Sequence, residues 1–325
     1  MAMPAKPSQG CTGRVIVGTR ASRLALAQTA IVVDLLKLRH PKLDVELRPI
    51  TTRGDRASAA GEQAPGAKGE FTTELEQALL EGRIDLAVHS AKDLPGAETA
   101  GLVVAAVPCR ADPRDALISR DGLSLADLPA GAGVGTSSPR RRAELLHLRP
   151  DLVVRPLRGN VDTRVGKVAA GQYDAIVLAK AGLERVGLAD QIVDVLAVET
   201  MVPAAGQGTL AVQVRVDDEE IGSWVSPLND DAVNMALGCE RAVAARLAGG
   251  CLAPIGVLAE VALDQIELTA AVLAPDGQGR AYARCSGQVT DRDGLVDRLV
   301  EDLRRQGADD LILARGAAPH RGSAG

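Results

Sequence analysis

The chain has 325 residues, of which 46% are hydrophobic and 1% aromatic, and it carries a formal net charge of −5. This length and hydrophobic content predict a globular protein with a sizeable core, divided into two or three domains. The scarcity of aromatic rings and the acidic balance argue against a nucleic-acid-binding protein, because such proteins stack bases on aromatic rings and carry excess positive charge.

Targeting signals and cysteine spacing indicate in which compartment the protein works. No stretch reaches the roughly 18 unbroken apolar residues of a membrane span, and the first 13 residues have no apolar core of an export signal. The five cysteines are odd in number and show no C-x-x-C spacing, which favours neither a disulfide framework nor a zinc site. We therefore expect a cytoplasmic protein with no nucleic-acid or membrane partner.

The N-terminal part of the chain alternates short apolar runs with amphipathic stretches. Val15–Gly18 predicts a strand, and Ser22 is the expected N-cap of a helix that ends before Pro41. Apolar and polar residues alternate over 43–47, which predicts the next strand. Residues 53–69 are rich in Gly, Ala and charge, and we expect a long loop that is either functional or mobile.

The next segments predict helices that alternate with buried strands. Thr73 and Glu76 have the spacing of a capping box, and Gly82 closes the helix that follows it. Ile84–Val88 is almost wholly apolar, which is typical of a strand buried on both faces of a parallel sheet. Further strands are predicted at Val103–Val107, Ala116–Ser119, Gly133–Gly135, Leu152–Val154, Ala175–Ala179 and Leu210–Val214. This alternation predicts α/β domains with right-handed crossovers.

The pattern changes after about Asp230. One long helix is predicted to stop at Gly249-Gly250, and strand-like runs flank the turn at residues 275–277. A last helix is expected to present Leu295, Leu299 and Leu303 on one face. These elements predict a small α+β domain with an antiparallel sheet.

The strongest local signal for chemistry is the run His89-Ser90-Ala91-Lys92-Asp93, directly after the predicted strand at 84–88. Ligands of open α/β sheets bind beyond the carboxyl ends of the strands. The run therefore lies where a site is expected, although a plain loop that pairs Lys92 with Asp93 fits its position equally well.

A second signal is the run from Gly135 to Pro139, followed by Arg140, Arg141 and Arg142. Ser138 as N-cap and Pro139 at the first helical position open a helix whose first turn carries three cations, which oppose the helix dipole. We interpret the run as an anion cradle of N–H groups, hydroxyls and arginines, in preference to a solvated basic turn.

A third group of cations consists of Arg155, Arg158 and Arg164, which again follow a predicted strand. Together with Arg20 after the first strand, they suggest a ligand with several anionic groups. Taken singly, each arginine fits an exposed ion pair as well as a ligand contact.

Cys251 follows two glycines at a predicted helix end. Such a turn leaves a thiol accessible for covalent chemistry, although a lone cysteine is more often a small apolar residue. The four histidines show no metal-ligand spacing, so no metal site is predicted.

Several of these runs together resemble one family. The chain is identified as a member of the porphobilinogen deaminase (hydroxymethylbilane synthase) family on the following runs, which occur in family order: Val17–Ser22, Ala87–Pro95, Asp112–Ala116, Val134–Ser138, Leu157–Asn160, Pro203–Gly208 and Gly249–Gly256.

The resemblance implies an α/β fold of two domains like those of periplasmic binding proteins, followed by a small α+β C-terminal domain. The implied first domain is discontinuous and comprises residues 14–108 and 204–228. The second domain, residues 109–203, is inserted into it, and residues 229–325 form the third domain, which carries the cofactor cysteine.

The resemblance also implies an activity. The family's enzymes are transferases that join four porphobilinogen molecules into the linear tetrapyrrole hydroxymethylbilane on a dipyrromethane cofactor, and a monomer is expected. Cys251 would hold this cofactor through a thioether, and Asp93 would be the catalytic carboxylate. The other cofactor-binding residues implied are Ser90, Lys92, Thr136, Ser137, Ser138, Arg140, Arg141 and Arg158. The substrate-binding residues implied are Arg20, Ser22, Arg158, Arg164, Arg185 and Lys68.

The chain departs from the family pattern in one loop, which commonly reads G-G-K-G-L-F and here reads Gly-Ala-Lys-Gly-Glu-Phe over residues 66–71. Two other functions remain as alternatives. A non-catalytic two-lobed binding protein for an anionic solute would explain the α/β pattern and the arginines. A thiol hydrolase would use Cys251 with His89 or His147.

Overall fold

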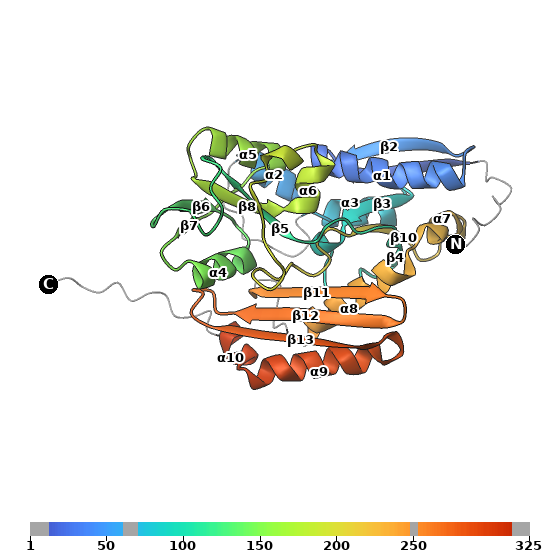
Figure 1. Cartoon of the computed structure of the whole chain (residues 1–325). Coiled ribbons are helices and arrows are strands. Elements are labelled where there is room, and N and C mark those ends of the chain that lie inside the picture. Colours follow the sequence, from blue (N-terminus) through green and yellow to red (C-terminus); the bar gives the residue numbers. More distant parts are fainter. Residues whose placement is uncertain (1–12, 61–70, 248–252, 314–325) are drawn as a thin grey trace.

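The computed structural model describes residues 13–60, 71–247 and 253–313 of the chain. Three sheets organise these residues, and each has its own covering helices (Figure 1). Among the described residues, no helix is both long and apolar enough to span a bilayer.

The first sheet has the strand order β2-β1-β3-β10-β4. Its strands are β1 (Arg14–Arg20), β2 (Asp44–Ile50), β3 (Leu86–Ser90), β4 (Leu102–Ala106) and β10 (Leu210–Arg215). β1 pairs in parallel with β2 and β3, whereas β10 lies antiparallel between β3 and β4. The chain therefore leaves this sheet after β4 and returns to it about a hundred residues later, after it has formed the second sheet.

Helices cover the first sheet and carry side chains toward its edge. They are α1 (Arg23–Arg39), α2 (Arg53–Ala60), α3 (Thr73–Leu80), α7 (Glu219–Val225) and the short helices η1 (Ala91–Asp93) and η3 (Ser226–Leu228). Val32, Val33 and Leu36 of α1 pack with Val15 and Val17 of β1 in one core cluster. This packing follows from the apolar stripe that the α1 sequence presents every three to four residues.

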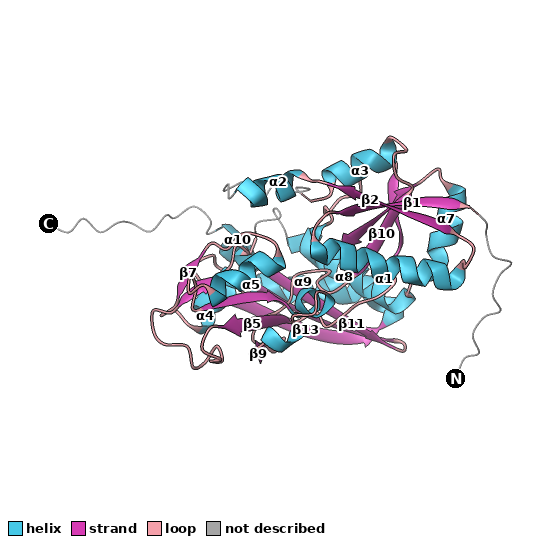
Figure 2. Ribbon diagram, turned by 90° about the horizontal axis from the view of Figure 1, so that it is seen from above, coloured by secondary structure: helices cyan, strands magenta, loops and turns pink. Residues whose placement is uncertain are grey.

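The second sheet has the order β7-β6-β8-β5-β9. Its strands are β5 (Asp115–Ser119), β6 (Gly133–Gly135), β7 (Val153–Arg155), β8 (Ala175–Ala179) and β9 (Asp194–Val195), and its helices are α4 (Pro139–Leu148), α5 (Val161–Ala169), α6 (Lys180–Arg185) and η2 (Ala189–Gln191). β6 pairs in parallel with β7 and β8, and β5 is antiparallel to β8 and β9. Figure 2, the view from above, separates α4, α5, β5 and β7 from the sheet around β1, β2 and β10.

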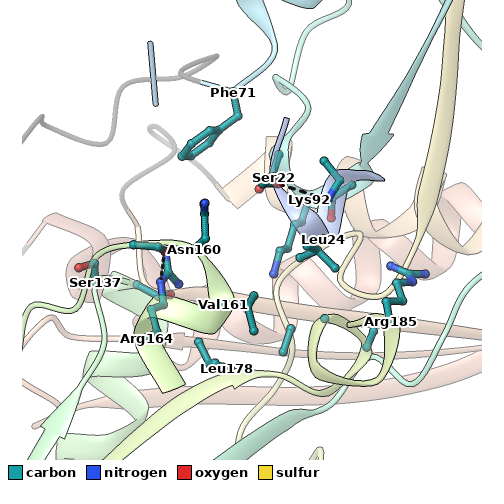
Figure 3. A pocket seen from close by; sticks show the side chains of 18 of the residues that line it. Ser22, Leu24, Phe71, Lys92, Ser137, Asn160, Val161, Arg164, Leu178 and Arg185 are labelled. Atoms are coloured by element: carbon teal, nitrogen blue, oxygen red, sulfur yellow. Dashed lines mark hydrogen bonds between the residues drawn. The ribbon is translucent and has the colours of Figure 1, made fainter. Parts of the chain in front are cut away.

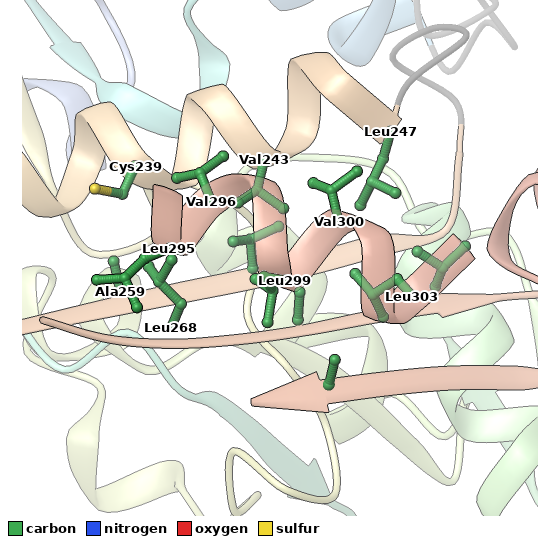
Figure 4. Packing of buried hydrophobic residues seen from close by; sticks show 14 of the residues in the cluster. Cys239, Val243, Leu247, Ala259, Leu268, Leu295, Val296, Leu299, Val300 and Leu303 are labelled. Carbon is green, nitrogen blue, oxygen red and sulfur yellow. The ribbon is translucent and has the colours of Figure 1, made fainter. Parts of the chain in front are cut away.

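The C-terminal part is an antiparallel three-stranded sheet under helices. Its elements are α8 (Asp231–Leu247), β11 (Ile255–Ala262), β12 (Gln265–Leu273), β13 (Arg280–Gln288), η4 (Val289–Asp291), α9 (Arg292–Arg305) and α10 (Ala308–Leu313). Val243 of α8 and Leu295, Leu299 and Leu303 of α9 meet Leu268 of the sheet in one buried cluster (Figure 4). The predicted α+β arrangement and the predicted Leu face of the last helix are both confirmed.

Two local predictions were wrong. Residues 53–60 of the expected loop form the helix α2, because Thr52 and Asp55 make reciprocal side-chain to backbone bonds around its first turn. Thr73 lies inside α3 and Thr72 is its N-cap, without a side-chain capping bond, so the predicted capping box of Thr73 and Glu76 does not form.

The two larger sheets are mixed, whereas the buried run at 84–88 predicted a parallel one. β3 is parallel to β1 but antiparallel to β10, since burial on both faces makes a strand apolar whatever the direction of its neighbours. The α/β class with a smaller α+β unit is confirmed. The domain bounds given above stay a prediction.

Glu240 of α8 bonds to both chain segments that connect the first two sheets, one after β4 and one before β10, and to the C-terminal sheet. Its carboxylate is fully buried and pairs with Arg110 at 2.7 Å. It also accepts hydrogen bonds from the backbone N–H groups of Gly206 (2.6 Å) and Ala259 (2.8 Å). Arg110 lies on the outgoing segment and Gly206 on the returning one, so this one carboxylate joins three parts of the fold.

Replacing Glu240 with Gln should therefore lower the free energy of unfolding by about 3 kcal/mol, because it leaves the buried Arg110 guanidinium without its counter-charge. Chemical denaturation of both proteins measures the difference. The matched control is Glu267→Gln, which removes a pair with the half-exposed Arg284 and should cost less than about 1 kcal/mol. Equal losses in the two variants would contradict this account of Glu240.

Candidate functional site

A cleft of about 430 Å³ opens where strands of the first two sheets end (Figure 3). Its walls come from the carboxyl ends of β1, β3, β6 and β8 and from the loop after β7. The volume lies within the range of small-molecule sites. The location is the one that the strand-end argument predicted for the run 89–93.

Helix N-termini point backbone N–H groups at this cleft. Ser22 caps α1 by accepting a bond from the N–H of Ala25 at 3.2 Å, and Ser138 caps α4 by accepting one from the N–H of Arg141 at 3.4 Å. Both caps were predicted, as was Pro139 in the first turn of α4. Such helix ends carry partial positive charge and favour anions.

Cations dominate the side chains that line the cleft. Among the described lining residues six are cationic and two are acidic, namely Arg20, Lys92, Arg141, Arg158, Arg164 and Arg185 against Asp93 and Asp162. Asp162 is itself paired with the exposed Arg23 at 2.6 Å. The cleft therefore has an excess of positive charge, which an anionic ligand would neutralise.

Desolvation by the surrounding protein, followed by neighbouring cations, lowers the pKa values of two side chains that line the cleft. Lys92 donates to Oε1 of Gln207 at 3.3 Å. Its side chain is exposed within the cleft, yet the surrounding protein, followed by the charge of Arg141, lowers its pKa to about 8. Arg164 donates to the carbonyl of Gly159 at 2.6 Å (Figure 3), and burial followed by the charges of Arg141 and Arg158 lowers its pKa to about 10.

Two of the predicted anion-binding arginines already have an internal anion. Arg140 and Arg141 pair with the buried Asp115 of β5 at 2.7 and 2.8 Å. Asp115 thus pairs with two of the three cations that oppose the α4 dipole and offsets one of their two charges, a part that the sequence had suggested for a ligand. Arg141 also lines the cleft, whereas Arg140 is buried behind it and donates to the carbonyl of Val202 at 2.8 Å. Its proposed contact with a cofactor stays a prediction.

The hydroxyl residues before α4 shape the cleft wall. The Ser137 hydroxyl donates to the carbonyl of Leu157 at 2.8 Å and accepts from its N–H at 3.0 Å. The Thr136 hydroxyl accepts from the N–H of Ser138 at 3.2 Å. These bonds join the end of β6 to the loop after β7, which brings Arg158 to the same cleft as Ser138.

Asp93 lies at the cleft in the short helix η1, which follows β3. Its carboxylate makes no hydrogen bond or ion pair in the part of the chain that the structure describes, although its charge acts on Lys92 and Arg164. Ala91, two residues earlier, donates its N–H to the carbonyl of Thr209 at 3.0 Å. A half-buried carboxylate without a partner, surrounded by cations, is free to act on a bound molecule.

The Asp93 turn is held from two other directions. Arg241 of α8 donates to the carbonyls of Pro95 (2.8 Å) and Gly96 (3.1 Å). A Cβ on Gly206, which has a positive φ of 74°, would approach the backbone of Ala91 and Lys92 to 3.0 Å. A glycine is therefore required here by both its conformation and the close approach.

Arg20 and Arg185 complete the cationic lining. Arg185 donates to the carbonyl of Gly208 at 2.6 Å, and burial lowers its pKa. Arg20 pairs with Asp55 and lies under the ring of Phe71, 4.1 Å from its centroid.

Arg155, which the sequence grouped with these cations, does not join them. It is exposed and donates to the carbonyl of Gln172 at 2.8 Å.

The histidines of the thiol-hydrolase alternative gain no support. His89 is buried in β3, its Nε2 lies 3.0 Å from Oε1 of Gln213, and burial lowers its pKa to about 4. His147 contacts the carbonyl of Gly277 through Nδ1 at 3.0 Å. Neither histidine is among the residues that line the cleft.

Two predicted residues, Cys251 and Lys68, lie outside the described residues.

Within residues 13–60, 71–247 and 253–313, no group of three His, Cys, Asp or Glu side chains could hold a metal ion. Three further residues, not predicted from the sequence, position the site: Asp55, Asp115 and Gln207. Asp115 and Gln207 lie inside runs quoted for the family resemblance, whereas nothing in the local sequence singles out Asp55.

Comparisons with known proteins match almost the whole chain. The family model "Porphobilinogen deaminase, dipyromethane cofactor binding domain" matches residues 15–223, and "Porphobilinogen deaminase, C-terminal domain" matches residues 235–305. A porphobilinogen deaminase of Roseiflexus sp. is 49% identical over 299 residues, which cover 92% of this chain and 98% of that protein. One of Brevibacillus brevis is 46% identical and covers 92% of this chain and 97% of its own length. Among solved structures, the methionine-binding protein MetQ matches at a TM-score of 0.43 with 15% identity, over 68% of this chain and 92% of that one.

The lowered pKa of Lys92 can be tested by chemical labelling. In Cys251→Ser protein, which lacks the expected thioether anchor, acylation of Lys92 by a neutral amine reagent should rise with a midpoint near pH 8. Peptide mass spectrometry follows each lysine, and the exposed Lys37 of α1 is the reference. In the wild-type protein a bound polyanion should raise the midpoint, because negative charge stabilises the ammonium form. A Lys92 midpoint that coincides with that of Lys37 in the Cys251→Ser protein would contradict the electrostatic picture.

Proposed function

The chain belongs to the porphobilinogen deaminase family, and we propose that it joins four porphobilinogen molecules head to tail, with loss of ammonia, into the linear tetrapyrrole hydroxymethylbilane. In this reaction the enzyme is a transferase. The observation that carries the proposal is the cleft that six cations line together with Asp93, whose carboxylate has no hydrogen bond or ion pair among the described residues.

The cleft fits the dipyrromethane cofactor that the matched family domain is described as binding. A carboxylated dipyrrole offers several anions to Lys92, Arg141 and Arg158, and the capped end of α4 adds N–H donors. The charge of Arg141 lowers the pKa of Lys92, and the charges of Arg141 and Arg158 lower that of Arg164, so the cleft favours such anions. Cys251 is the proposed thioether anchor. When bound, this group would supply the free pyrrole α-carbon that the first incoming unit alkylates, and each added ring would then offer its own free α-carbon to the next unit.

Asp93 is the proposed catalytic carboxylate. Loss of ammonia from porphobilinogen leaves a cation spread over the pyrrole ring and its methylene carbon. A fixed carboxylate stabilises that cation electrostatically, and it can accept the proton that the pyrrole ring must lose after the new carbon–carbon bond forms. The absence of a hydrogen-bonding partner for Asp93 among the described residues supports this role, since the carboxylate does not have to break an internal pair to act.

The remaining arginines are proposed to orient substrate. Each porphobilinogen brings an acetate and a propionate, and Arg164 and Arg185, with Arg158, present cations around one side of the cleft. Arg20, the last residue of β1, and Ser22, the N-cap of α1, also line the cleft. Carboxylate–guanidinium pairs fix both position and orientation, so the methylene carbon can be held near its nucleophile throughout each addition.

The proposed assembly and location are a monomer in the cytoplasm. The described cysteines Cys109, Cys239 and Cys285 are all free thiols, which fits a reducing compartment.

The proposed function predicts a covalent adduct. Intact-protein mass spectrometry of the denatured wild-type protein should show the added mass of two pyrrole units, because the thioether survives unfolding. The Cys251→Ser protein should lack it. A wild-type protein of unmodified mass that consumes no porphobilinogen would instead favour a non-catalytic binding protein with the same cationic cleft.

Replacing Asp93 with Asn should preserve the fold and lower kcat by about a hundredfold or more, because it removes the stabilising charge and the proton acceptor. Consumption of porphobilinogen at saturation measures the effect, and thermal unfolding checks the fold. The control is Asp162→Asn in the same cleft, where the carboxylate is already paired with Arg23 and a change of less than about threefold is expected. Near-normal turnover in the Asp93 variant would remove the residue from this role.

A further inference from the structure

Two neighbouring side chains, Asp55 and Phe71, hold the Arg20 guanidinium in one orientation. Its guanidinium makes a side-on pair with Asp55 of α2, in which Nε lies 3.2 Å from Oδ2 and Nη2 lies 2.5 Å from Oδ1. The Phe71 ring covers the guanidinium plane at 4.1 Å. One edge and one face of the group are therefore fixed by residues outside β1, on which Arg20 lies.

Thr52, three residues earlier, fixes the Asp55 carboxylate. Its Oδ2 accepts hydrogen bonds from the backbone N–H of Thr52 at 3.1 Å and from the Thr52 hydroxyl at 2.8 Å. Only 14% of the Asp55 side chain and 20% of the Arg20 side chain is exposed. The pair is well shielded from solvent, so its geometry is more rigid than that of a surface ion pair.

The side-on pair leaves a second fork of Arg20 open. A guanidinium has five N–H donors, and a side-on carboxylate occupies those of Nε and one of Nη2. The end-on fork between Nη1 and Nη2 makes no hydrogen bond in the part of the chain that the structure describes, and Arg20 lines the cleft. A substrate carboxylate can therefore bind Arg20 in a bidentate manner while Asp55 stays in place.

We propose that Asp55 is a positioning residue for substrate binding, which orients the Arg20 guanidinium so that its end-on fork receives a carboxylate of the incoming pyrrole. This inference rests on the proposed function. It assigns to α2 the task of holding a binding group in its productive orientation. Substrate binding is then more favourable, because the Arg20 side chain has already lost its rotamer freedom in the folded protein and does not have to lose it on binding.

The test replaces Asp55 with Asn, which keeps the size of the side chain and an acceptor for Thr52 but removes the charge and one of the two acceptors for Arg20. KM for porphobilinogen should rise about tenfold, the equivalent of one charge-assisted hydrogen bond, while kcat changes by less than about twofold. In an Arg20→Gln background the same substitution should change KM by less than about twofold, because Asp55 acts through Arg20.

The matched control is Arg56→Gln. Arg56 lies on the same helix and pairs with Glu74 at 3.0 Å, so this change perturbs the packing of α2 and leaves the Arg20 pair intact. Its KM should stay within about twofold of the wild-type value. A tenfold rise in this control would mean that any disturbance of α2 raises KM, and would overturn the proposal.

A second readout is independent of turnover. The Arg20 Nε–H signal in ¹⁵N NMR, assigned by its loss in Arg20→Gln, should be visible at neutral pH in the wild-type protein and lost in Asp55→Ala, which removes both oxygens that accept from Arg20 and so the bond that slows exchange. An Arg20 signal that persists in Asp55→Ala would overturn the proposal. So would a fall in KM, which would show that Asp55 competes with substrate, or an equal rise in KM in the Arg20→Gln background. If the wild-type protein consumed no porphobilinogen, the proposed function would fail, and the NMR signal would still report whether Asp55 fixes Arg20.

Discussion

Positive charge gathered in a partly buried cleft is unfavourable unless anions neutralise it, and this constraint explains most of the site. Asp115 pairs with Arg140 and Arg141 from within the second sheet and offsets one of their two charges, and Asp55 pairs with Arg20 from α2. These carboxylates hold their arginines in fixed orientations. Lys92 and Arg164 are left with lowered pKa values beside other cations, so the folded protein is prepared for a ligand that carries several negative charges.

The same constraint distinguishes the acidic residues of the site. Three acidic residues lie in ion pairs with arginine, namely Asp115, Asp55 and Asp162. Their negative charges hold arginine side chains in place. Asp93 has no such pair within the described residues. In a cleft where almost every charge is either positive or already neutralised, the unpaired carboxylate is the group that can respond to a cation that forms on the substrate.

The position of Asp93 depends on the first sheet, on the chain segment that returns to it and on α8 of the C-terminal part. Its turn follows β3 of the first sheet, packs on Gly206 of the returning segment and is bonded by Arg241 of α8. Glu240, the neighbour of Arg241, binds the outgoing and returning segments together through Arg110 and Gly206. The C-terminal unit therefore supports the geometry of a cleft that its own sheet does not line.

The sequence by itself determined the kinds of elements and much of the site. Apolar runs placed the strands, Ser22 and Ser138 were recognisable as helix caps, and polar runs at strand ends marked Lys92, Asp93, Ser138 and Arg158, because these signals depend on residues close together in the chain. The long-range pairings had no such local signal. The antiparallel insertion of β10, the Asp115 partner of the α4 arginines and the Asp55 partner of Arg20 each join residues more than twenty positions apart. Only the tertiary structure decided them, because which charges meet, and in which direction a buried strand runs, are set by the packing of whole sheets.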